Sequence, residues 1–237
     1  MAARASGIAV AAPSGARPWQ VAVDVPGVPP GVAVRVLRLE LAEPRVDLDA
    51  AATVLSPAER ERAARGAPSV RRRRILVRAA LRDLLAEVLG TTPAAVPLAP
   101  EPGRPRLLGT ACGVVIDASC SSSGDVGLVA VAQAARIGVD VERLAHDDLR
   151  IAAEEGWLAP GERDAITALP VAERGRALTR AWVQKEAVLK GEGSGLRADP
   201  SWTVTPIAER GRVRRWWLLP LEVPPAFVAS LAVAPAE

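Results

Sequence analysis

The spacing of apolar residues along the chain predicts several short strands and two long helices. Side chains alternate between the two faces of a strand, whereas those on one face of a helix recur every three to four residues. The helical spacing covers about 70–89 and about 172–190. Strand-like runs occur at 32–41, 113–118, 126–133, 137–144, 202–207, 213–219 and 227–233. Strands and helices grouped in this way predict an α+β fold.

Residues that favour helix ends support these boundaries. Ser56 and Glu59 have the spacing of a capping box, and Ser69 is expected to cap the longer helix that follows. Gly90 is expected to end that helix, because glycine readily adopts the left-handed conformation of a helix C-terminus. The proline-rich residues 91–106 predict a loop.

A repeated pattern indicates that the chain contains two similar halves. Pro57 and Pro160 lie 103 residues apart, and the residues around them match at the same interval. The matching segments are Leu55-x-Pro57-x-Glu59-Arg60 and Leu158-x-Pro160-x-Glu162-Arg163. We therefore predict two α+β halves, 31–135 and 136–237, related by a pseudo-two-fold. The alternative is that alanine-rich sequence aligns easily with itself.

Composition narrows the class of protein. Of the 237 residues, 49% are hydrophobic, which argues against a disordered chain. The formal net charge of +3 argues against general nucleic-acid binding. Residues 1–30 are rich in Ala, Gly and Pro and predict a flexible N-terminal extension.

The chain lacks the sequence signals of secretion and of membrane insertion. Cys112 and Cys120 are too few for a disulfide scaffold. The first residues contain no long apolar run, and no run reaches the length of a transmembrane helix. We therefore expect a cytoplasmic protein that does not bind membranes.

Two acidic residues interrupt an otherwise apolar strand. Asp140 and Glu142 are two apart, so their carboxylates point to the same face. Leu37 and Leu39 occupy the corresponding positions of the first half, so this acidic face belongs to the second half alone. Neighbouring carboxylates repel each other unless a cation or a proton relieves them. A solvated acidic face is the simpler alternative for this pair.

The second long helix supplies another acid. Glu186 and Lys190 lie four apart on one helix face, as a surface ion pair would. The glycine-rich residues 191–196 after them permit close approach to a ligand. With Asp140 and Glu142, Glu186 forms an all-oxygen set that suits Mg²⁺ rather than zinc.

The histidine and the arginine run complete the charged candidates. His146 stands beside two aspartates in a predicted loop and is expected to be solvated rather than a metal ligand.

The consecutive arginines 71–74 begin a helix, where their charge opposes the helix dipole. A bound anion would offset this cost, which indicates a local anion site. Four consecutive helical residues cover all sides, however, so most of these arginines can also simply face solvent.

Two motifs give the chain a specific resemblance. The strand contains Gly138-x-Asp140-x-Glu142, and the helix contains Trp182-x-x-Lys185-Glu186-Ala187-x-x-Lys190. Together they resemble the signatures of 4′-phosphopantetheinyl transferases of the surfactin-synthetase-activating (Sfp) type, over roughly residues 32–234. The resemblance implies the two-half fold of that family. It also implies Mg²⁺-dependent transfer of phosphopantetheine from coenzyme A to a serine of an apo carrier protein, with release of adenosine 3′,5′-bisphosphate.

The resemblance also implies roles for individual residues. Asp140, Glu142 and Glu186 would hold Mg²⁺, and Glu186 would take the proton of the acceptor serine. Asp140 and Lys190 would also lie against the bound coenzyme A, and Lys190 would balance charge there, while Lys185 would touch phosphate. The remaining contacts to coenzyme A are expected from Arg62, Arg73, Arg104 and Ser119.

One segment departs from the family pattern. Where the family has an asparagine and a histidine around the equivalent of Ser119, this chain has Asp117 and Cys120. Cys120 cannot supply the positive charge of a histidine to a pyrophosphate. Either an arginine compensates, or activity is weaker, or coenzyme A sits differently. A small buried cysteine without a role in the site is the simpler alternative.

Three functions remain open at this stage. The first is an active transferase that serves acyl or peptidyl carriers of polyketide, nonribosomal-peptide or fatty-acid synthesis. The second is a non-catalytic homologue that binds the carrier, and the third is a Mg²⁺-dependent pyrophosphate hydrolase. Since two halves in one chain already enclose a cleft, a monomer is expected.

Overall fold

The computed structural model describes residues 19–28, 33–42, 46–100, 103–108, 115–144, 155–194 and 198–236. Within them the strands form two antiparallel four-stranded sheets. The first sheet has the order β1 (Trp19–Ala22), β2 (Ala33–Glu40), β4 (Val126–Gln133) and β3 (Ile116–Ser123). The second has the order β5 (Ala135–Arg143), β8 (Phe227–Pro235), β7 (Trp216–Pro220) and β6 (Gly211–Val213).

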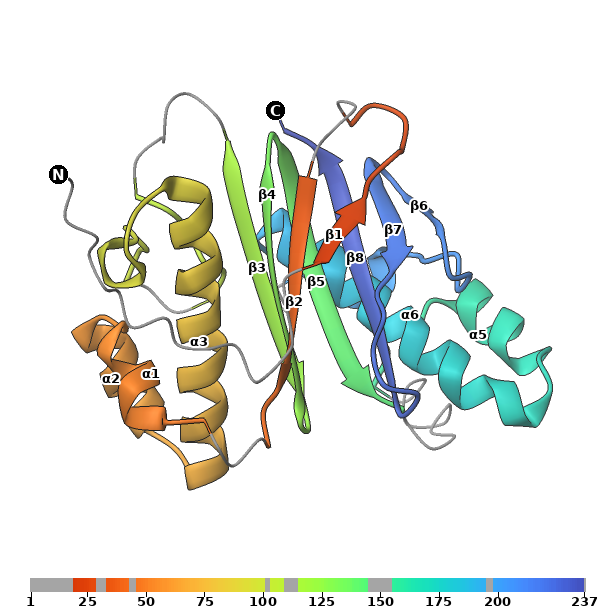
Figure 1. The fold of residues 1–237 in the computed structure, drawn as a ribbon. Coiled ribbons are helices and arrows are strands. Elements are labelled where there is room, and N and C mark those ends of the chain that lie inside the picture. Colours follow the sequence, from red (N-terminus) through yellow and green to blue (C-terminus); the bar gives the residue numbers. More distant parts are fainter. Residues whose placement is uncertain are drawn as a thin grey trace, which may run out of the picture.

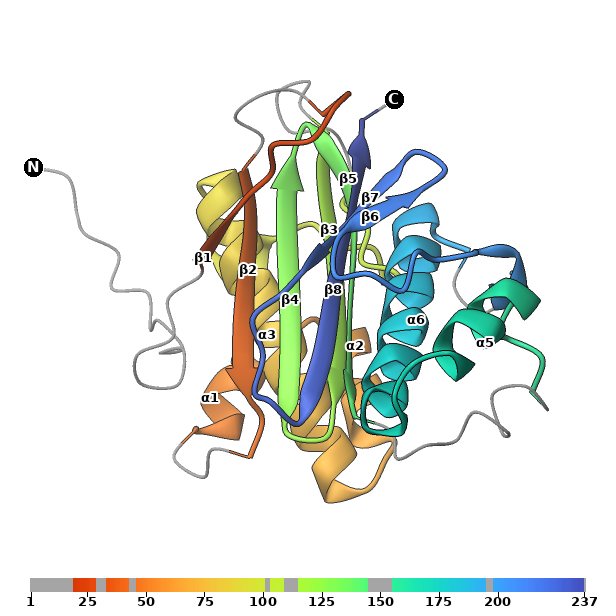
Figure 2. The same cartoon turned by 90° about the vertical axis from the view of Figure 1, so that its right-hand side faces the viewer.

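The helices cover the outer faces of the two sheets (Figures 1 and 2). Against the first sheet lies α3 (Pro68–Leu89), and α1 (Leu48–Thr53) and α2 (Pro57–Ala64) pack on α3, which the short η1 (Pro93–Ala95) follows. Against the second sheet lies α6 (Val171–Glu192), and α5 (Pro160–Thr167) packs on α6, which η3 (Pro200–Trp202) follows. The order of layers is therefore helix, sheet, sheet, helix.

Alternation along the strands explains this layering. On β4, Leu128 and Ala130 enter the core between the two sheets, whereas Val129 and Val131 pack against α3. Because both faces of β4 are covered, nearly the whole strand is buried. A strand buried on both faces must be apolar throughout, as β4 is.

A single residue connects the two sheets. β4 ends at Gln133 and β5 begins at Ala135, so the chain passes from one sheet to the other at Ala134. Ala134 has a φ of 59°, in the left-handed region that a non-glycine residue seldom adopts. The chain therefore turns sharply at the boundary predicted between the two halves.

The order of helices repeats at the predicted interval. α2 and α3 begin at Pro57 and Pro68, and α5 and α6 begin at Pro160 and Val171. Each long helix follows its short one and lies on the outer face of its own sheet. The repeat of elements agrees with two similar halves, while their relation by a pseudo-two-fold stays a prediction.

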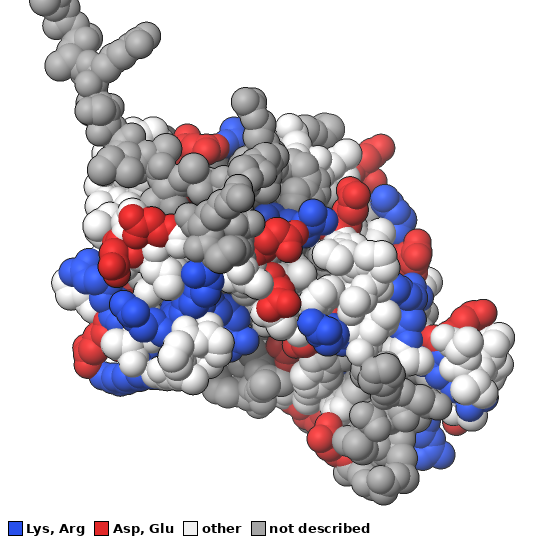
Figure 3. Space-filling view, turned by 60° about the horizontal axis from the view of Figure 1, so that its bottom comes forward, with Lys and Arg blue, Asp and Glu red and all other residues white. Residues whose placement is uncertain are grey.

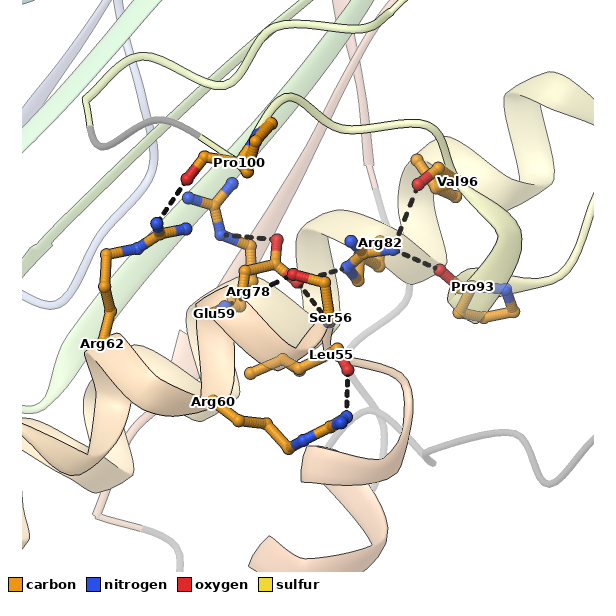
Figure 4. A network of polar contacts seen from close by, with 10 residues as sticks. All are labelled: Leu55, Ser56, Glu59, Arg60, Arg62, Arg78, Arg82, Pro93, Val96 and Pro100. Carbon is orange, nitrogen blue, oxygen red and sulfur yellow. Dashed lines mark hydrogen bonds and ion pairs between the residues drawn. The ribbon is translucent and has the colours of Figure 1, made fainter.

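A buried ion pair fixes the helices of the first half. Glu59 accepts a hydrogen bond from the backbone N–H of Ser56 at 2.7 Å and pairs with Arg82 of α3 at 2.8 Å. Arg82 also donates to the carbonyls of Pro93 and Val96 in the loop that follows α3 (Figure 4). Burial alone would raise the pKa of Glu59, but its hydrogen bonds and the charge of Arg82 hold this pKa low.

The second half contains an equivalent buried ion pair. Glu162 accepts from the backbone N–H of Ala159 at 2.9 Å and pairs with Lys185 of α6 at 2.7 Å. Lys185 donates to the carbonyls of Pro200 and Thr203 in the loop after α6. Arg82 and Lys185 thus have equivalent positions. Arg82 connects α3 to α2 and to the segment after α3, and Lys185 connects α6 to α5 and to the segment after α6.

Most predicted helices and strands are confirmed, and the others differ as follows. The run predicted as one strand at 213–219 is a hairpin, because β6 ends at Val213 and β7 begins at Trp216. The strand predicted at 202–207 is wrong, because the Lys185–Glu162 pair takes up its polar groups: Thr203 O accepts from Lys185, and Thr205 N donates to Glu162. Ser69 does not cap α3, which begins at Pro68 with Ala67 as its N-cap residue.

The remaining differences concern β1, β3 and helix α1. β1 lies within residues 1–30, which were expected to be a flexible extension, and it pairs with β2. β3 spans Ile116–Ser123 rather than 113–118, and residues 113–114 lie outside the described part. Helix α1 is an element that the sequence pattern did not predict. In the described residues no helix is long and apolar enough to span a membrane.

A half-buried aspartate on α3 makes stability depend on pH. Burial, together with the charge of Glu87, raises the pKa of Asp83 to about 6, whereas the unfolded chain has about 3.9. The folded chain therefore loses stability as pH rises from about 4 to about 6. Because Asp83 is only partly buried, we expect Asp83→Asn to raise stability at pH 8 by about 1 kcal/mol, or 2–4 °C in Tm.

Thermal unfolding at pH 8 and at pH 4.5 checks this prediction. The gain should be clear at pH 8 and small at pH 4.5, where Asp83 is largely protonated in the folded chain. Glu61→Gln on the exposed surface of α2 removes the same charge and is the matched control. An equal Tm shift at both pH values would contradict the argument.

Candidate active site

The two sheets meet at a junction built from side chains of β3. Asp117 Oδ2 accepts a hydrogen bond from Ile137 N at 2.8 Å, and Ser119 Oγ accepts from Val139 N at 3.0 Å. Further along, Ser123 Oγ accepts from Arg143 N at 3.1 Å. Each of these three hydrogen bonds joins a polar side chain on β3 to a backbone N–H on β5. The polar character of β3 thus has a structural cause.

Two serines of β3, Ser121 and Ser123, donate hydrogen bonds to the two acids of β5. Ser121 Oγ donates to Asp140 Oδ1 at 2.6 Å, and Ser123 Oγ donates to Glu142 Oε2 at 2.6 Å. Lys190 of α6 reaches across and lies 2.5 Å from Asp140 Oδ1. Asp140 is therefore buried between a hydroxyl and an ammonium group.

Close packing brings α6 to these acids. A Cβ at Gly138 would lie 1.9 Å from the carbonyl oxygen of Ala187, and a Cβ at Gly191 would lie 2.4 Å from the ring of Trp216. Only glycine permits such an approach of helix and sheet. The two glycines let α6 lie directly on β5 and β7, so that Glu186 and Lys190 stand over Asp140.

The three carboxylates perturb one another. Burial raises the pKa of Asp140, against the effect of Lys190. Burial also raises the pKa of Glu142 and of Glu186, and the charges of neighbouring acids raise both further. Burial alone would lower the pKa of Lys190, but the charges of Asp140 and Glu186 raise it overall. Asp140, Glu142, Glu186 and Lys190 therefore form one electrostatic unit, which we call the acidic cluster.

The acidic cluster has the chemistry of a cation site. Among the described residues no three His, Cys, Asp or Glu side chains are arranged as a complete metal-binding group. Two buried carboxylate oxygens, Asp140 Oδ2 and Glu186 Oε1, have no hydrogen-bond partner within the described part of the chain. A buried oxygen without a partner is costly, and a hard cation would satisfy both. The donor set therefore fits Mg²⁺.

A basic cavity of about 540 Å³ opens between α2, α3 and β3. Figure 3 shows many Lys and Arg side chains on the side of the molecule where α2 and α3 lie. Arg62 and Arg73, both predicted from the sequence, line the cavity. Its other lining residues are Glu59, Ala63, Arg65, Arg74, Val77, Arg78, Gly103, Cys120 and Ser122.

Contacts within the protein hold several of these arginines in place. Arg78 lies 3.4 Å from the buried Glu59, and Arg62 donates to the carbonyl of Pro100 (Figure 4). Arg74 donates to the carbonyls of Arg62 and Arg65 at 2.8 and 2.9 Å. The arginine run 71–74 predicted an anion site here, but neither Arg74 nor Arg78 was expected to contact the ligand individually, although their spacing of four on one helix places both on the same face.

The cavity adjoins the acidic cluster. Arg73 lines the cavity and lowers the pKa of Glu142 electrostatically, although burial keeps that pKa raised overall. Cys120 also lines the cavity and interacts electrostatically with Lys190. A phosphate group bound among the arginines would thus lie close to the acids.

Three predicted ligand contacts have other partners in the structure. Lys185 is fully buried and paired with Glu162, so its ammonium group is not available to a phosphate. Ser119 accepts from Val139 N. Arg104 pairs with Asp117, and its guanidinium group also donates to two backbone carbonyls. His146 and Cys112 lie outside the described residues.

The fold and the site define an α+β protein with a basic cavity beside a cluster of three carboxylates, of which Asp140 and Glu186 are buried. Residues 136–220 match the family model of the 4′-phosphopantetheinyl transferase superfamily, ACPS. The matched segment contains all four residues of the acidic cluster. The matched segment is 85 of the 237 residues, so the match shows similarity to this superfamily over part of the second half of the chain. No curated protein matches the chain.

Proposed function

We propose that this protein transfers the 4′-phosphopantetheine group of coenzyme A to a serine of an apo acyl or peptidyl carrier protein. The serine oxygen forms a bond to the phosphorus that carries the pantetheine arm. The bond from that phosphorus to the leaving adenosine 3′,5′-bisphosphate breaks. A transferase of the Sfp type is the form that the two motifs favour.

One observation carries the proposal: a cavity rich in arginine adjoins three carboxylates whose pKa values are all raised. The arginines suit the 3′-phosphate and the pyrophosphate of coenzyme A, because guanidinium groups bind phosphate through paired hydrogen bonds. The volume of about 540 Å³ lies in the range of small-molecule sites. The cavity supplies only the arginines and the acidic cluster supplies only the carboxylates, so the proposed reaction needs both.

Within the acidic cluster we assign roles by position. Asp140, Glu142 and Glu186 would hold Mg²⁺. When bound, this ion would neutralise the charge that develops on the leaving phosphate. Glu186 has a raised pKa and an oxygen without a partner among the described residues, as expected of a base that accepts the serine proton. Lys190 opposes the rise in the pKa of Asp140 that burial causes.

The direct test is incubation of the protein with coenzyme A, Mg²⁺ and an apo carrier protein. We expect the mass of the carrier to rise by one phosphopantetheine group, with release of adenosine 3′,5′-bisphosphate. Cleavage of coenzyme A without a carrier would instead indicate a pyrophosphate hydrolase. Carrier binding without either reaction would indicate a non-catalytic homologue. In both cases the proposal fails.

The cavity predicts how an arginine variant discriminates between donors. Arg73→Ala should raise the KM for coenzyme A by about tenfold or more, because a charged hydrogen bond to phosphate contributes about 1.5–3 kcal/mol. The KM for 3′-dephospho-coenzyme A should change much less. Steady-state kinetics with both donors give the measurement.

The control for this variant is Arg35→Ala, which removes an exposed arginine paired with Glu87 away from the cavity. It should leave both KM values unchanged. If Arg73→Ala weakens the two donors equally, Arg73 does not contact the 3′-phosphate.

A further inference from the structure

Arg104 joins three parts of the fold that surround the acidic cluster. Its Nη1 donates to the carbonyl of Gly191, the penultimate residue of α6, at 2.7 Å. Its Nη2 donates to the carbonyl of Ile137 on β5 at 3.0 Å and pairs with Asp117 on β3. The side chain is 12% exposed, so both ends of the guanidinium group are committed to contacts inside the protein.

Asp117 and Arg136 complete this arrangement. The Asp117 carboxylate accepts from the backbone N–H groups of Ile137 and Ala118 as well as from Arg104. Arg136 Nε lies 3.3 Å from Asp117 Oδ2, and its Nη2 donates to Gly191 O at 3.4 Å. We call Arg104, Asp117, Arg136 and the Gly191 carbonyl the clamp. The negative charge of Asp117, which a neutral amide would lack, offsets part of the two positive charges of Arg104 and Arg136.

The clamp contacts the end of α6 that carries Glu186 and Lys190 of the acidic cluster. Carbonyls of the last helical turn lack partners within the helix, and cations near them are favourable. Gly191 follows Lys190 directly, and Glu186 lies just over one turn earlier. The helix touches β5 at Gly138 as well, so packing and the clamp together fix the last turn beside Asp140.

We propose that Arg104 is a positioning residue, which holds the last turn of α6 so that Glu186 and Lys190 stay opposite Asp140. This role replaces the contact to coenzyme A expected from the sequence, and it rests on the proposed function. Within the described residues, Gly103 lines the basic cavity and Arg104 does not. The charge of Arg104 is balanced by Asp117 rather than by a ligand.

Kinetics distinguish positioning from ligand binding. In Arg104→Ala we expect kcat to fall by about a hundredfold, the loss that a displacement of about 1 Å causes, with the KM for coenzyme A changed less than about threefold. Arg73→Ala, whose side chain lines the cavity, should show the reverse pattern. Arg104→Lys should remain close to Arg104→Ala, because lysine keeps the charge but cannot hold two carbonyls in a fork geometry.

Hydrogen exchange tests the clamp without any reaction. In Arg104→Ala, the amides of residues 187–193 should exchange about tenfold faster, because the last turn of α6 opens more easily. The amides of α3 should be unchanged. Arg35→Ala serves as the control and should alter neither helix. If Arg104→Ala does not fold, Arg136→Ala removes the more exposed arm of the clamp, with a smaller expected loss of kcat of about threefold to tenfold.

The outcomes separate the two proposals. A raised KM for coenzyme A with unchanged kcat and unchanged exchange would show that Arg104 is a ligand contact, and the clamp proposal would fail. Wild-type protein that modifies no carrier overturns the proposed function instead. In that case faster exchange at 187–193 in Arg104→Ala still supports the clamp, and unchanged exchange overturns it.

Discussion

Replacing Lys185 with methionine is expected to lower the free energy of unfolding by about 3–5 kcal/mol. The substitution leaves Glu162 buried without its cation and also removes the donors to the carbonyls of Pro200 and Thr203. An uncompensated buried carboxylate carries a large desolvation cost. Denaturant unfolding of the wild type and the variant gives the difference.

The double variant Glu162→Leu/Lys185→Met is the informative control. It removes the charge and its partner together, so it should be clearly less destabilised than Lys185→Met alone. The folded fraction of Lys185→Met should keep the wild-type KM for coenzyme A. A tenfold rise of that KM with normal stability would instead restore the phosphate contact first expected for Lys185.

Replacing Glu186 with glutamine is expected to reduce transfer by a factor of about 10²–10⁴, the usual contribution of a general base. The same change should leave stability unchanged or raise it. In the folded protein, burial and the charges of Asp140 and Glu142 disfavour the ionised form of Glu186. Loss of activity without loss of stability is the signature of a residue kept for function.

Glu192→Gln provides the matched control for this prediction. Glu192 lies on the same helix, is partly exposed and pairs with Arg214 at 3.1 Å. Its replacement should leave the rate of transfer nearly unchanged. Measured rates that are the same for Glu186→Gln and the wild type would show that Glu186 is neither the base nor a metal ligand in a transferase.

Those features of the fold that depend on local sequence could be predicted. The spacing of apolar residues located α3, α6, β4 and β8, because one face or both faces of each element are buried. The capping box at Ser56 is also confirmed. Each of these signals lies within a few neighbouring residues.

Features that depend on tertiary partners could not be predicted. The polar strand β3 has no apolar alternation beyond Ala118, because its serines bond to the backbone and acids of β5. Residues 202–207 have the composition of a strand, but the buried Lys185–Glu162 pair takes up their polar groups. Neither partner is visible from sequence position alone.

The candidate site, like the fold, could be predicted only where the signal lies in local sequence. Spacing placed Asp140 and Glu142 on one face, and the motifs singled out Glu186 and Lys190. The structure brings these four residues together. Motif matching cannot tell a lysine that faces a ligand from one that faces a buried glutamate, so it misplaced Lys185. The repeated Glu–cation pair of the first half, Glu59–Arg82, is the signal that could have corrected this.

The passage through Ala134 has a consequence for how such a protein would work. A connection of one residue, reinforced by the β3–β5 junction, leaves the two halves no hinge about which to open and close. The basic cavity, whose lining lies in the first half, and the acidic cluster of the second half would therefore keep a fixed position relative to each other. Adjustment during a catalytic cycle would fall to side chains and surface loops, with rapid binding that needs no domain closure.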